Sequence, residues 1–347
     1  MTIDARFSGE TAVAASEVDC VHPSLGAAGR ETRGRLPDFL IVGHPKCGTT
    51  ALYHTLRSHS QIYMPEMKEP WFFVPELHSP FRSPADGRPD TIGQYMALFA
   101  DAAPGQRVGE ASSSYLMSLQ AAGRIAQAVP AARIVAIVRE PASFLRSLHL
   151  QFVQTQVERE TDLRTALELE PRRRRGECVP ERSARPQALL YSEHVRYVEQ
   201  LLRYREVFPA EQVLVLVYED FRRDNRATVH QVLRFLEVDA EETPQPVQAN
   251  PSVRVRSPHL QELLQTVSVG RGPVSRAAKS SLKAITSRSL RRRALRGIRR
   301  GVLFAEPEPA DERLMLELRR RYKPEVVALS EYLGRDLLSL WGYDRLD

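Results

Sequence analysis

The residues best suited to chemistry lie together near the start of the sequence. A short apolar run at 39–43 leads through a turn into a helical pattern, and the turn holds a lysine, a glycine and two threonines. Backbone N–H groups at a helix N-terminus attract anions, a lysine adds a point charge, and hydroxyls add further donors. The spacing therefore predicts a phosphate-binding loop made of Pro45, Lys46, Cys47, Gly48, Thr49 and Thr50.

The order of residues in this loop differs from that of nucleotide triphosphatases. Their pattern, GxxxxGK[ST], places lysine directly before the hydroxyl that holds magnesium. Here Lys46 precedes Gly48, and the buried strands predicted at 133–138 and 213–218 are followed by Arg139 and Glu219 rather than by aspartate. We therefore expect a phosphate site without a metal ion. An ATP-using phosphotransferase is the alternative enzyme class.

The loop and a second motif together resemble the sulfotransferases that use PAPS (3′-phosphoadenosine 5′-phosphosulfate). The loop is similar to the PKxGTT loop that holds the 5′-phosphosulfate in that family. The second motif is a strand-end arginine with a serine eight residues later, here Arg139 and Ser147. The resemblance implies that these two residues bind the 3′-phosphate, and a guanidinium is well suited to bidentate contact with phosphate.

The resemblance runs from about residue 38 to residue 343 and is closest to the bacterial-type and heparan sulfate sulfotransferase-like branch. It implies an α/β fold, with a P-loop-like parallel sheet flanked by helices. It also implies transfer of a sulfuryl group from PAPS to a hydroxyl or amine, with PAP as the leaving nucleotide and Lys46 stabilising its charge. The acceptor, whether a glycan, a lipid or a secondary metabolite, is left open.

Two glutamates are candidates for the general base that removes the acceptor's proton. In the heparan branch a glutamate of the corresponding stretch has this role, so the resemblance implies Glu69. Its apolar neighbours could raise the carboxyl pKa toward a useful range. Glu110, which ends a short strand predicted at 107–110, is the alternative base and a candidate acceptor contact.

Aromatic side chains near these motifs could stack on a sugar or an aromatic acceptor. The candidates are Trp71, Phe72, Phe73, Tyr115 and Tyr191. An arginine run at 172–175 in a Pro-rich stretch could meet an anionic substrate, although such runs are usually solvated. Histidines near the motifs (His44, His54 and His149) lack a partner at ligand spacing, so we interpret them as structural. The Cys47 thiol lies near a helix N-terminus, where its pKa can fall.

The elements that must position these residues alternate between strand and helix. Buried strands are predicted at 39–43, 133–138 and 213–218, and helices at 49–58, 121–129, 143–155, 189–207 and 220–236. This alternation indicates a parallel sheet with ligands beyond its carboxyl ends. An exposed loop is expected at 171–186, and a C-terminal helix at 311–333 broken near Pro324. We expect a disordered tail at 1–36 and a single domain at 37–347.

The net charge of +6 comes from one segment, since eleven basic and no acidic residues lie between 271 and 300. A basic helical insertion is expected at about 270–303. It could lie on anionic lipid, cover an acidic substrate, or form a solvated surface. No nucleic-acid-binding module accompanies the charge. A non-catalytic nucleotide-binding protein that docks on membranes is therefore the alternative outside the enzymes.

The cysteines and the N-terminal residues favour a cytoplasmic location. Three cysteines, at 20, 47 and 178, form neither a complete disulfide framework nor a zinc pattern. The first residues lack the charged and apolar regions of a secretory signal. No apolar run approaches the roughly 18 residues that a membrane span needs.

Overall fold

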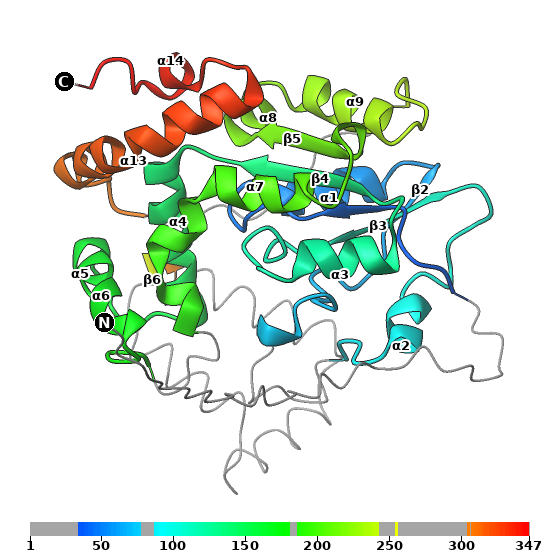
Figure 1. The fold of residues 1–347 in the computed structure, drawn as a ribbon, viewed down its shortest axis with the longest axis horizontal. Helices are drawn as coiled ribbons and strands as arrows, with labels where there is room; N and C mark the ends of the chain where they lie inside the picture. The colour runs from blue at the N-terminus through cyan, green and yellow to red at the C-terminus, as the bar shows by residue number, and fades with distance from the viewer. Residues whose placement is uncertain are drawn as a thin grey trace, which may run out of the picture. The chain divides into compact units, whose positions relative to one another are not determined.

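A parallel sheet of five strands forms the centre of the molecule (Figure 1), in the order β2-β3-β1-β4-β5. The computed structural model describes residues 34–77, 87–180, 186–242, 254–255, 304–305 and 307–346. The predicted α/β fold, a parallel sheet flanked by helices, is confirmed. The strands are β1 (Phe39–Ile41), β2 (Ile62–Tyr63), β3 (Arg107–Ala111), β4 (Arg133–Val138) and β5 (Val213–Val217), and β6 (Arg254–Val255) pairs antiparallel with β7 (Phe304–Ala305).

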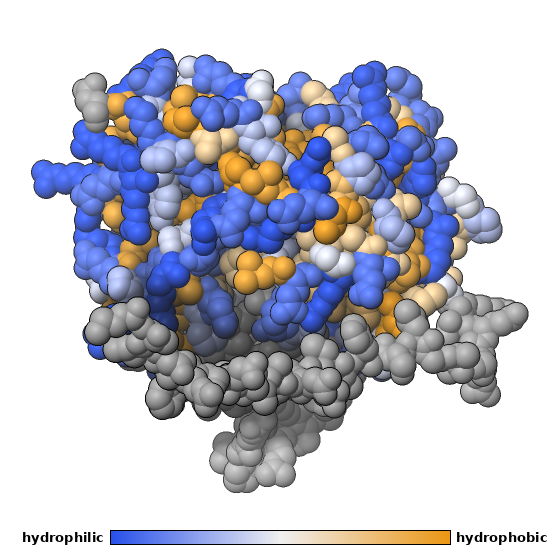
Figure 2. Space-filling model, in the orientation of Figure 1, coloured by the Kyte–Doolittle hydropathy of each residue, from blue (hydrophilic) through white to orange (hydrophobic). Residues whose placement is uncertain are grey.

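The helices cover the sheet, with α13 and α14 near β5 and α8 in Figure 1. They are α1 (Thr49–Arg57), α2 (Ile92–Ala97), α3 (Ala121–Ala128), α4 (Pro141–Thr155), α5 (Leu163–Glu168), α6 (Glu170–Arg174), α7 (Tyr197–Arg205), α8 (Tyr218–Arg223), α9 (Asn225–Phe235), α13 (Glu312–Leu333) and α14 (Leu337–Trp341). Short 3-10 turns span Pro75–Leu77, Pro186–Leu189, Tyr191–Val195 and Ala210–Gln212. On the face shown in Figure 2, hydrophobic side chains lie between hydrophilic ones.

The sheet order brings the two predicted phosphate-binding motifs to one place. β1 is entirely buried and lies between β3 and β4, with Phe39 opposite Arg133 and Ile41 opposite Val135. After β3 on one side of β1, the chain crosses to β4 on the other side. In open parallel sheets, ligands bind beyond the carboxyl ends of the strands where the order reverses in this way. The loops after β1 and β4 meet there.

Two predicted helices are interrupted. The helix predicted at 189–207 consists of two 3-10 turns followed by α7. Ser192, within the second turn, donates from its backbone N–H to Glu170, a partner 22 positions earlier in the chain, at 3.1 Å. The helix predicted at 220–236 divides at Asp224, whose side chain caps α9 by accepting from the N–H of Ala227 at 2.9 Å.

Two further predictions about helices are wrong. α13 continues through Pro324 without the expected break, and the fixed φ of proline lies within the helical range. The exposed loop predicted at 171–186 begins instead within α6. None of the helices in the described ranges combines the length and apolar character of a membrane-crossing helix. The basic segment 271–300 and tail residues 1–33 lie outside those ranges.

Candidate active site

The loop between β1 and α1 is shaped by close packing and by two left-handed residues. A Cβ at Gly43 would lie 2.3 Å from the backbone nitrogen of Ile137 in β4, so only glycine permits this approach. Lys46 has a φ of 66° and Gly48 a φ of 89°. Left-handed residues of this kind can turn successive backbone N–H groups toward one concave side and create an anion-binding nest. The loop therefore has the backbone expected of a phosphate cradle.

Arg139, directly after β4, joins the second motif to this loop. Its Nη1 donates to the backbone carbonyl of Lys46 at 2.9 Å, and its Nε donates to Ser143 Oγ at 3.2 Å. The guanidinium lies 4.6 Å from the centre of the Tyr218 ring. Ser147 follows Ser143 by four residues on α4 and is buried. The structure thus brings Lys46 and Arg139 together and places Ser147 on the helix that starts beside them.

Within the described residues, no carboxylate lies at ion-pair distance from the cations at this junction, and Glu219 is the carboxylate on which the charge of Arg139 acts from further away. Among the described residues, neither Lys46 nor Arg139 forms an ion pair with a carboxylate, whereas the buried Arg173 is paired with Glu158 at 2.7 Å. Burial and the nearby Arg139 lower the pKa of Lys46, as expected where two cations share a partly desolvated place. Lys46 and Arg139 are both partly exposed, so their charge is accessible, and two adjacent cations favour binding of an anion.

The end of the chain supports the loop after β4. Tyr343 donates from its hydroxyl to Glu140 at 2.6 Å, and the Trp341 indole donates to Glu219 at 2.9 Å. Glu140 caps α4 by accepting from the backbone N–H groups of residues 142 and 143. Its own N–H donates to Glu219 at 3.3 Å. Sequence reasoning missed this support, because the partners are far apart in the chain.

The carboxylate of Glu69 lies near the end of β3, where four hydrogen-bond donors surround it. Its oxygens accept from the Ser113 N–H at 2.9 Å, the Ser113 hydroxyl at 2.8 Å, the Trp71 indole at 2.8 Å and the Lys68 ammonium. Burial acts to raise the pKa of Glu69, but Lys68 and these hydrogen bonds outweigh it and the pKa is lowered. The predicted upward shift is therefore wrong, and Glu69 is ionised at neutral pH.

Glu110, the alternative base, is fully buried within β3. Its Oε2 accepts from the hydroxyls of Tyr95 at 3.1 Å and Tyr115 at 3.4 Å. Burial raises the pKa of Glu110 to about 8, so this carboxyl is mainly protonated at neutral pH. Its partners are core side chains, and this placement favours Glu69 for contact with an acceptor.

The predicted aromatic walls divide into buried and accessible residues. Tyr115 and Tyr191 are completely buried, so the prediction that they stack on an acceptor is wrong. Tyr191 instead donates to the buried Glu158 at 3.2 Å. Trp71 and Phe72 remain partly exposed: Phe72 stacks on Tyr95 with ring centres 4.4 Å apart, and the Arg88 guanidinium lies 3.7 Å above the Trp71 ring. Phe73 is buried.

The remaining polar candidates are structural. Each arginine of the run 172–175 forms an ion pair, so that run is neutralised internally. His44 is buried against Gln200 at 2.6 Å, and burial lowers its pKa to about 3. His149 is also buried, whereas His54 is partly exposed. Burial raises the pKa of Cys47, opposite to the expected fall. The described residues contain no cluster of His, Cys, Asp and Glu that could hold a metal ion.

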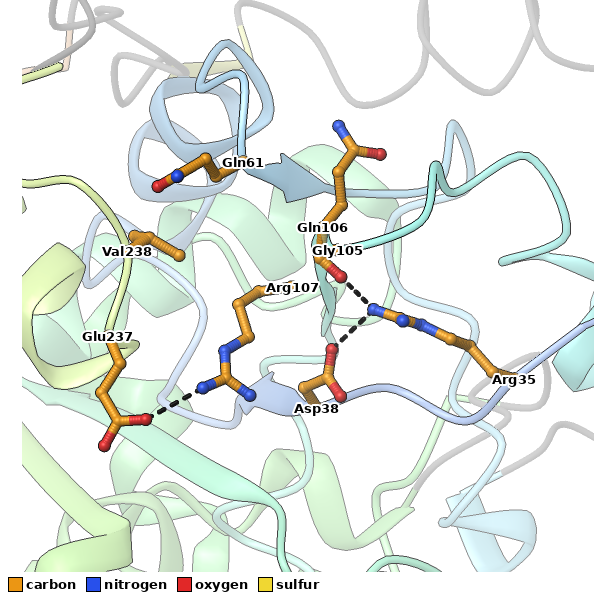
Figure 3. Close-up of a pocket in the computed structure, with 8 residues that line it drawn as sticks. All are labelled: Arg35, Asp38, Gln61, Gly105, Gln106, Arg107, Glu237 and Val238. Carbon is orange, nitrogen blue, oxygen red and sulfur yellow. Dashed lines mark hydrogen bonds and ion pairs between the residues drawn. The ribbon is translucent and has the colours of Figure 1, made fainter.

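An open cavity of about 360 Å³ lies at the amino ends of β1 and β3 (Figure 3). Arg107 pairs there with Glu237 at 2.9 Å, and Arg35 with Asp38 at 2.8 Å. These charges already satisfy one another. The cavity is at the opposite end of the strands from Lys46, so it is separate from the phosphate-binding loop. Its lining is completed by Gln61, Gly105, Gln106 and Val238.

The fold and the loop define an α/β protein whose turn at the carboxyl end of a parallel sheet has the backbone expected of an anion-binding nest. Residues 37–242 match the model of the sulfotransferase family. The chain belongs to that family.

Known relatives agree with this membership. The chain is 28% identical to human "Carbohydrate sulfotransferase 15" over 262 residues, which cover 60% of this chain and 45% of the human protein. It is also 28% identical to "Membrane-associated sulfotransferase kil1" of Dictyostelium discoideum over 106 residues, or 30% of this chain and 21% of that protein. The chain thus spans less than half the length of these curated relatives.

A solved structure shares the fold. The crystal structure of a sulfotransferase from Alicyclobacillus acidocaldarius superposes with a TM-score of 0.60 and 26% identity, covering 88% of this chain and 99% of the other. The family model and this structure support sulfuryl transfer in general.

Proposed function

We propose that the chain transfers a sulfuryl group from PAPS to a hydroxyl or amine and releases PAP. The observation that carries the proposal is the contact between Arg139 and the Lys46 loop, which brings together two cations that, in the part of the chain the structure describes, have no carboxylate at ion-pair distance. PAPS presents a 5′-phosphosulfate and a 3′-phosphate, so one anion fits each motif. Thr49, Thr50 and Ser147 would add hydroxyl donors.

The reaction assigns a separate task to each charged residue. The acceptor oxygen or nitrogen attacks sulfur, and the bond from sulfur to the bridging phosphate oxygen breaks. Glu69, which is ionised, takes the acceptor's proton. Lys46 stabilises the negative charge that develops on the departing oxygen. No metal ion takes part in this scheme.

We further propose that the acceptor is a carbohydrate and that the chain belongs to the heparan sulfate-like, bacterial-type branch. The name of the human relative and the resemblance of the loop around Glu69 support this assignment. Trp71 and Phe72 would provide the stacking surface. A cytoplasmic location, and contact of segment 271–300 with anionic membranes, remain predictions.

Calorimetry with PAP and with ATP tests the nucleotide assignment. PAP should bind without magnesium, and Arg139→Met should weaken this binding at least tenfold, because a bidentate charged contact is lost. The matched control is Arg133→Met, which changes the same residue type at the other end of β4 and should leave PAP affinity unchanged. Magnesium-dependent ATP binding without PAP binding would instead support a phosphotransferase.

Transfer of labelled sulfate from PAPS tests catalysis and identifies the acceptor. Carbohydrate fractions incubated with the chain and labelled PAPS should gain label, and mass spectrometry of the product should locate the sulfate. Glu69→Gln should lower the rate strongly while leaving PAP affinity intact. If the chain binds the nucleotide but transfers sulfate neither to a carbohydrate fraction nor to water, the result would support the non-catalytic alternative.

A further inference from the structure

The loop that carries Glu69 is attached by hydrogen bonds to the end of β3 and the residues that follow it. The Glu69 N–H donates to the Ala111 carbonyl at 3.0 Å, and the Trp71 N–H donates to Ser112 Oγ at 3.2 Å. Ser113 binds the Glu69 carboxylate twice, through its N–H and its hydroxyl. Three consecutive residues of β3 and its extension therefore hold one loop.

Two residues of this loop have a left-handed backbone conformation, which the hydrogen bonds to residues 111–113 help to hold. Glu69 has a φ of 62° and Trp71 a φ of 56°, both in the left-handed region that non-glycine residues seldom adopt. Such conformations persist where surrounding contacts fix them, and they concentrate at functional sites. The hydrogen bonds to residues 111–113 are surrounding contacts that fix the backbone of Glu69 and Trp71 in this way.

We propose that Ser113 is a positioning residue for the general base. This inference rests on the proposed function. Its N–H fixes Glu69 Oε2 and its hydroxyl fixes Oε1, so the carboxylate has one orientation before the acceptor arrives. The motif around Glu69 does not include Ser113, which lies 44 positions further along the chain.

The four hydrogen bonds to Glu69 also indicate how the carboxylate accepts a proton. Each oxygen of Glu69 already has two donors, so one donor must leave before the acceptor's O–H or N–H can bind. Lys68 is the donor on a long flexible stem, whereas Ser113 and the Trp71 ring are held by the fold. The acceptor takes the place of the Lys68 ammonium at Oε1, and its proton passes to that oxygen as the bond to sulfur forms.

The test compares Ser113→Ala with Ser114→Ala. The first variant removes only the hydroxyl donor and keeps the N–H contact. The second removes the neighbouring hydroxyl, which forms no hydrogen bond with Glu69. The reaction followed is release of PAP from PAPS with water as the acceptor, and then with the carbohydrate that the labelling experiment identifies.

Ser113→Ala should lower kcat about tenfold or more, the effect of losing one hydrogen bond to a charged group, with the KM for PAPS unchanged. Because that hydrogen bond lowers the pKa of Glu69, its loss should move the acid limb of the pH–rate profile to higher pH. Ser113→Thr should restore both properties. A purely structural serine would change thermal stability without moving the acid limb.

Two outcomes separate failure of this proposal from failure of the proposed function. If the parent chain releases PAP and Ser113→Ala, shown by calorimetry to bind PAP normally, has the rate and pH profile of Ser114→Ala, then Ser113 does not position the base. If the parent chain binds PAP but never consumes PAPS, the sulfotransferase proposal is wrong, and the positioning role falls with it.

Discussion

Glu69 and Glu110 contact the same end of β3, yet their environments favour opposite protonation states. Glu69 receives four donors, including the Lys68 ammonium, which stabilise its charge. Glu110 is enclosed by the core and receives two tyrosine hydroxyls. Desolvation disfavours charge whereas donors favour it, so the count and type of donors decide between the two carboxyls. Pairs of this kind commonly separate the acid and base roles at a site.

The protonated state of Glu110 predicts how stability depends on pH. Its folded pKa of about 8 lies above the usual 4.5, so the folded chain binds the extra proton between these values. The contribution of this group to stability should therefore fall as pH rises from about 4.5 to about 8, by up to about 1.4 kcal/mol per unit. Glu110→Gln, which cannot ionise, should abolish that fall. Chemical denaturation from pH 5 to 9 measures it, and equal slopes in both proteins would show that Glu110 is ionised in the fold.

At the residue scale, contiguous motifs were predictable and long-range contacts were not. Lys46 and Arg139 could be identified because each lies in a short segment whose spacing carries its chemistry. The role proposed for Ser113 depends on a loop that folds back across 44 positions. The backbone carbonyl of Tyr115 accepts from the hydroxyl of Tyr204, 89 positions later, at 3.0 Å. Neither partner is marked by local sequence.

At the scale of elements, the turn from β1 into α1 depends on Gly48. Its φ is 89°, and a Cβ there would lie 2.9 Å from the Phe221 ring of α8. The α8 helix thus packs directly on the phosphate-binding turn. An L side chain at this position would strain the backbone and displace the ring at the same time.

Gly48→Ala should lower the free energy of unfolding by about 1–3 kcal/mol, the cost of a strained residue, and should weaken PAP binding. Denaturation and calorimetry measure the two effects. The matched control is Gly123→Ala within α3, where no atom lies within 4 Å of the added Cβ. That control should be neutral or stabilising by up to about 1 kcal/mol, because alanine favours helix. Equal behaviour of the two variants would contradict the assigned strain.

The elements themselves were predicted where burial and periodicity agree. β4 and β5 match their apolar runs, and α1, α3 and α4 match the predicted helices to within a few residues. The helix predicted at 189–207 is divided, and Ser192 within it contacts Glu170, which lies outside that segment and could not be read from it. The helix predicted at 220–236 is divided because Asp224 is the N-cap of α9. Aspartate is a common N-cap residue but also occurs within helices, so its type alone does not predict the division.

At the scale of the whole molecule, the last residues are part of the site's support. Tyr343 and Trp341 contact the carboxylates that follow β4 and β5, and Tyr197 of α7 donates to the Arg139 carbonyl at 2.9 Å. Three distant segments thus fix the strand end that carries Arg139. The orientation of this arginine is a property of the assembled domain rather than of its own motif.

Tyr343→Phe should lower PAP affinity several-fold and stability by about 1–3 kcal/mol, because it removes a hydrogen bond to a buried carboxylate. Tyr332→Phe is the matched control. Within the described residues, no hydrogen bond is formed by the Tyr332 hydroxyl, so that variant should match the parent chain in both respects. Unchanged PAP affinity in Tyr343→Phe would show that Arg139 keeps its position without this support.

The contact between Glu140 and Tyr343 joins positions 203 residues apart, which has a consequence for biosynthesis. A ribosome makes Lys46, Arg139 and Ser147 early, but Tyr343 emerges only after nearly all of the described chain. A nascent protein that has already formed the sheet therefore still lacks part of the framework around its arginine. Under the proposed function, products that stop before Tyr343 should form the sheet but retain PAP poorly.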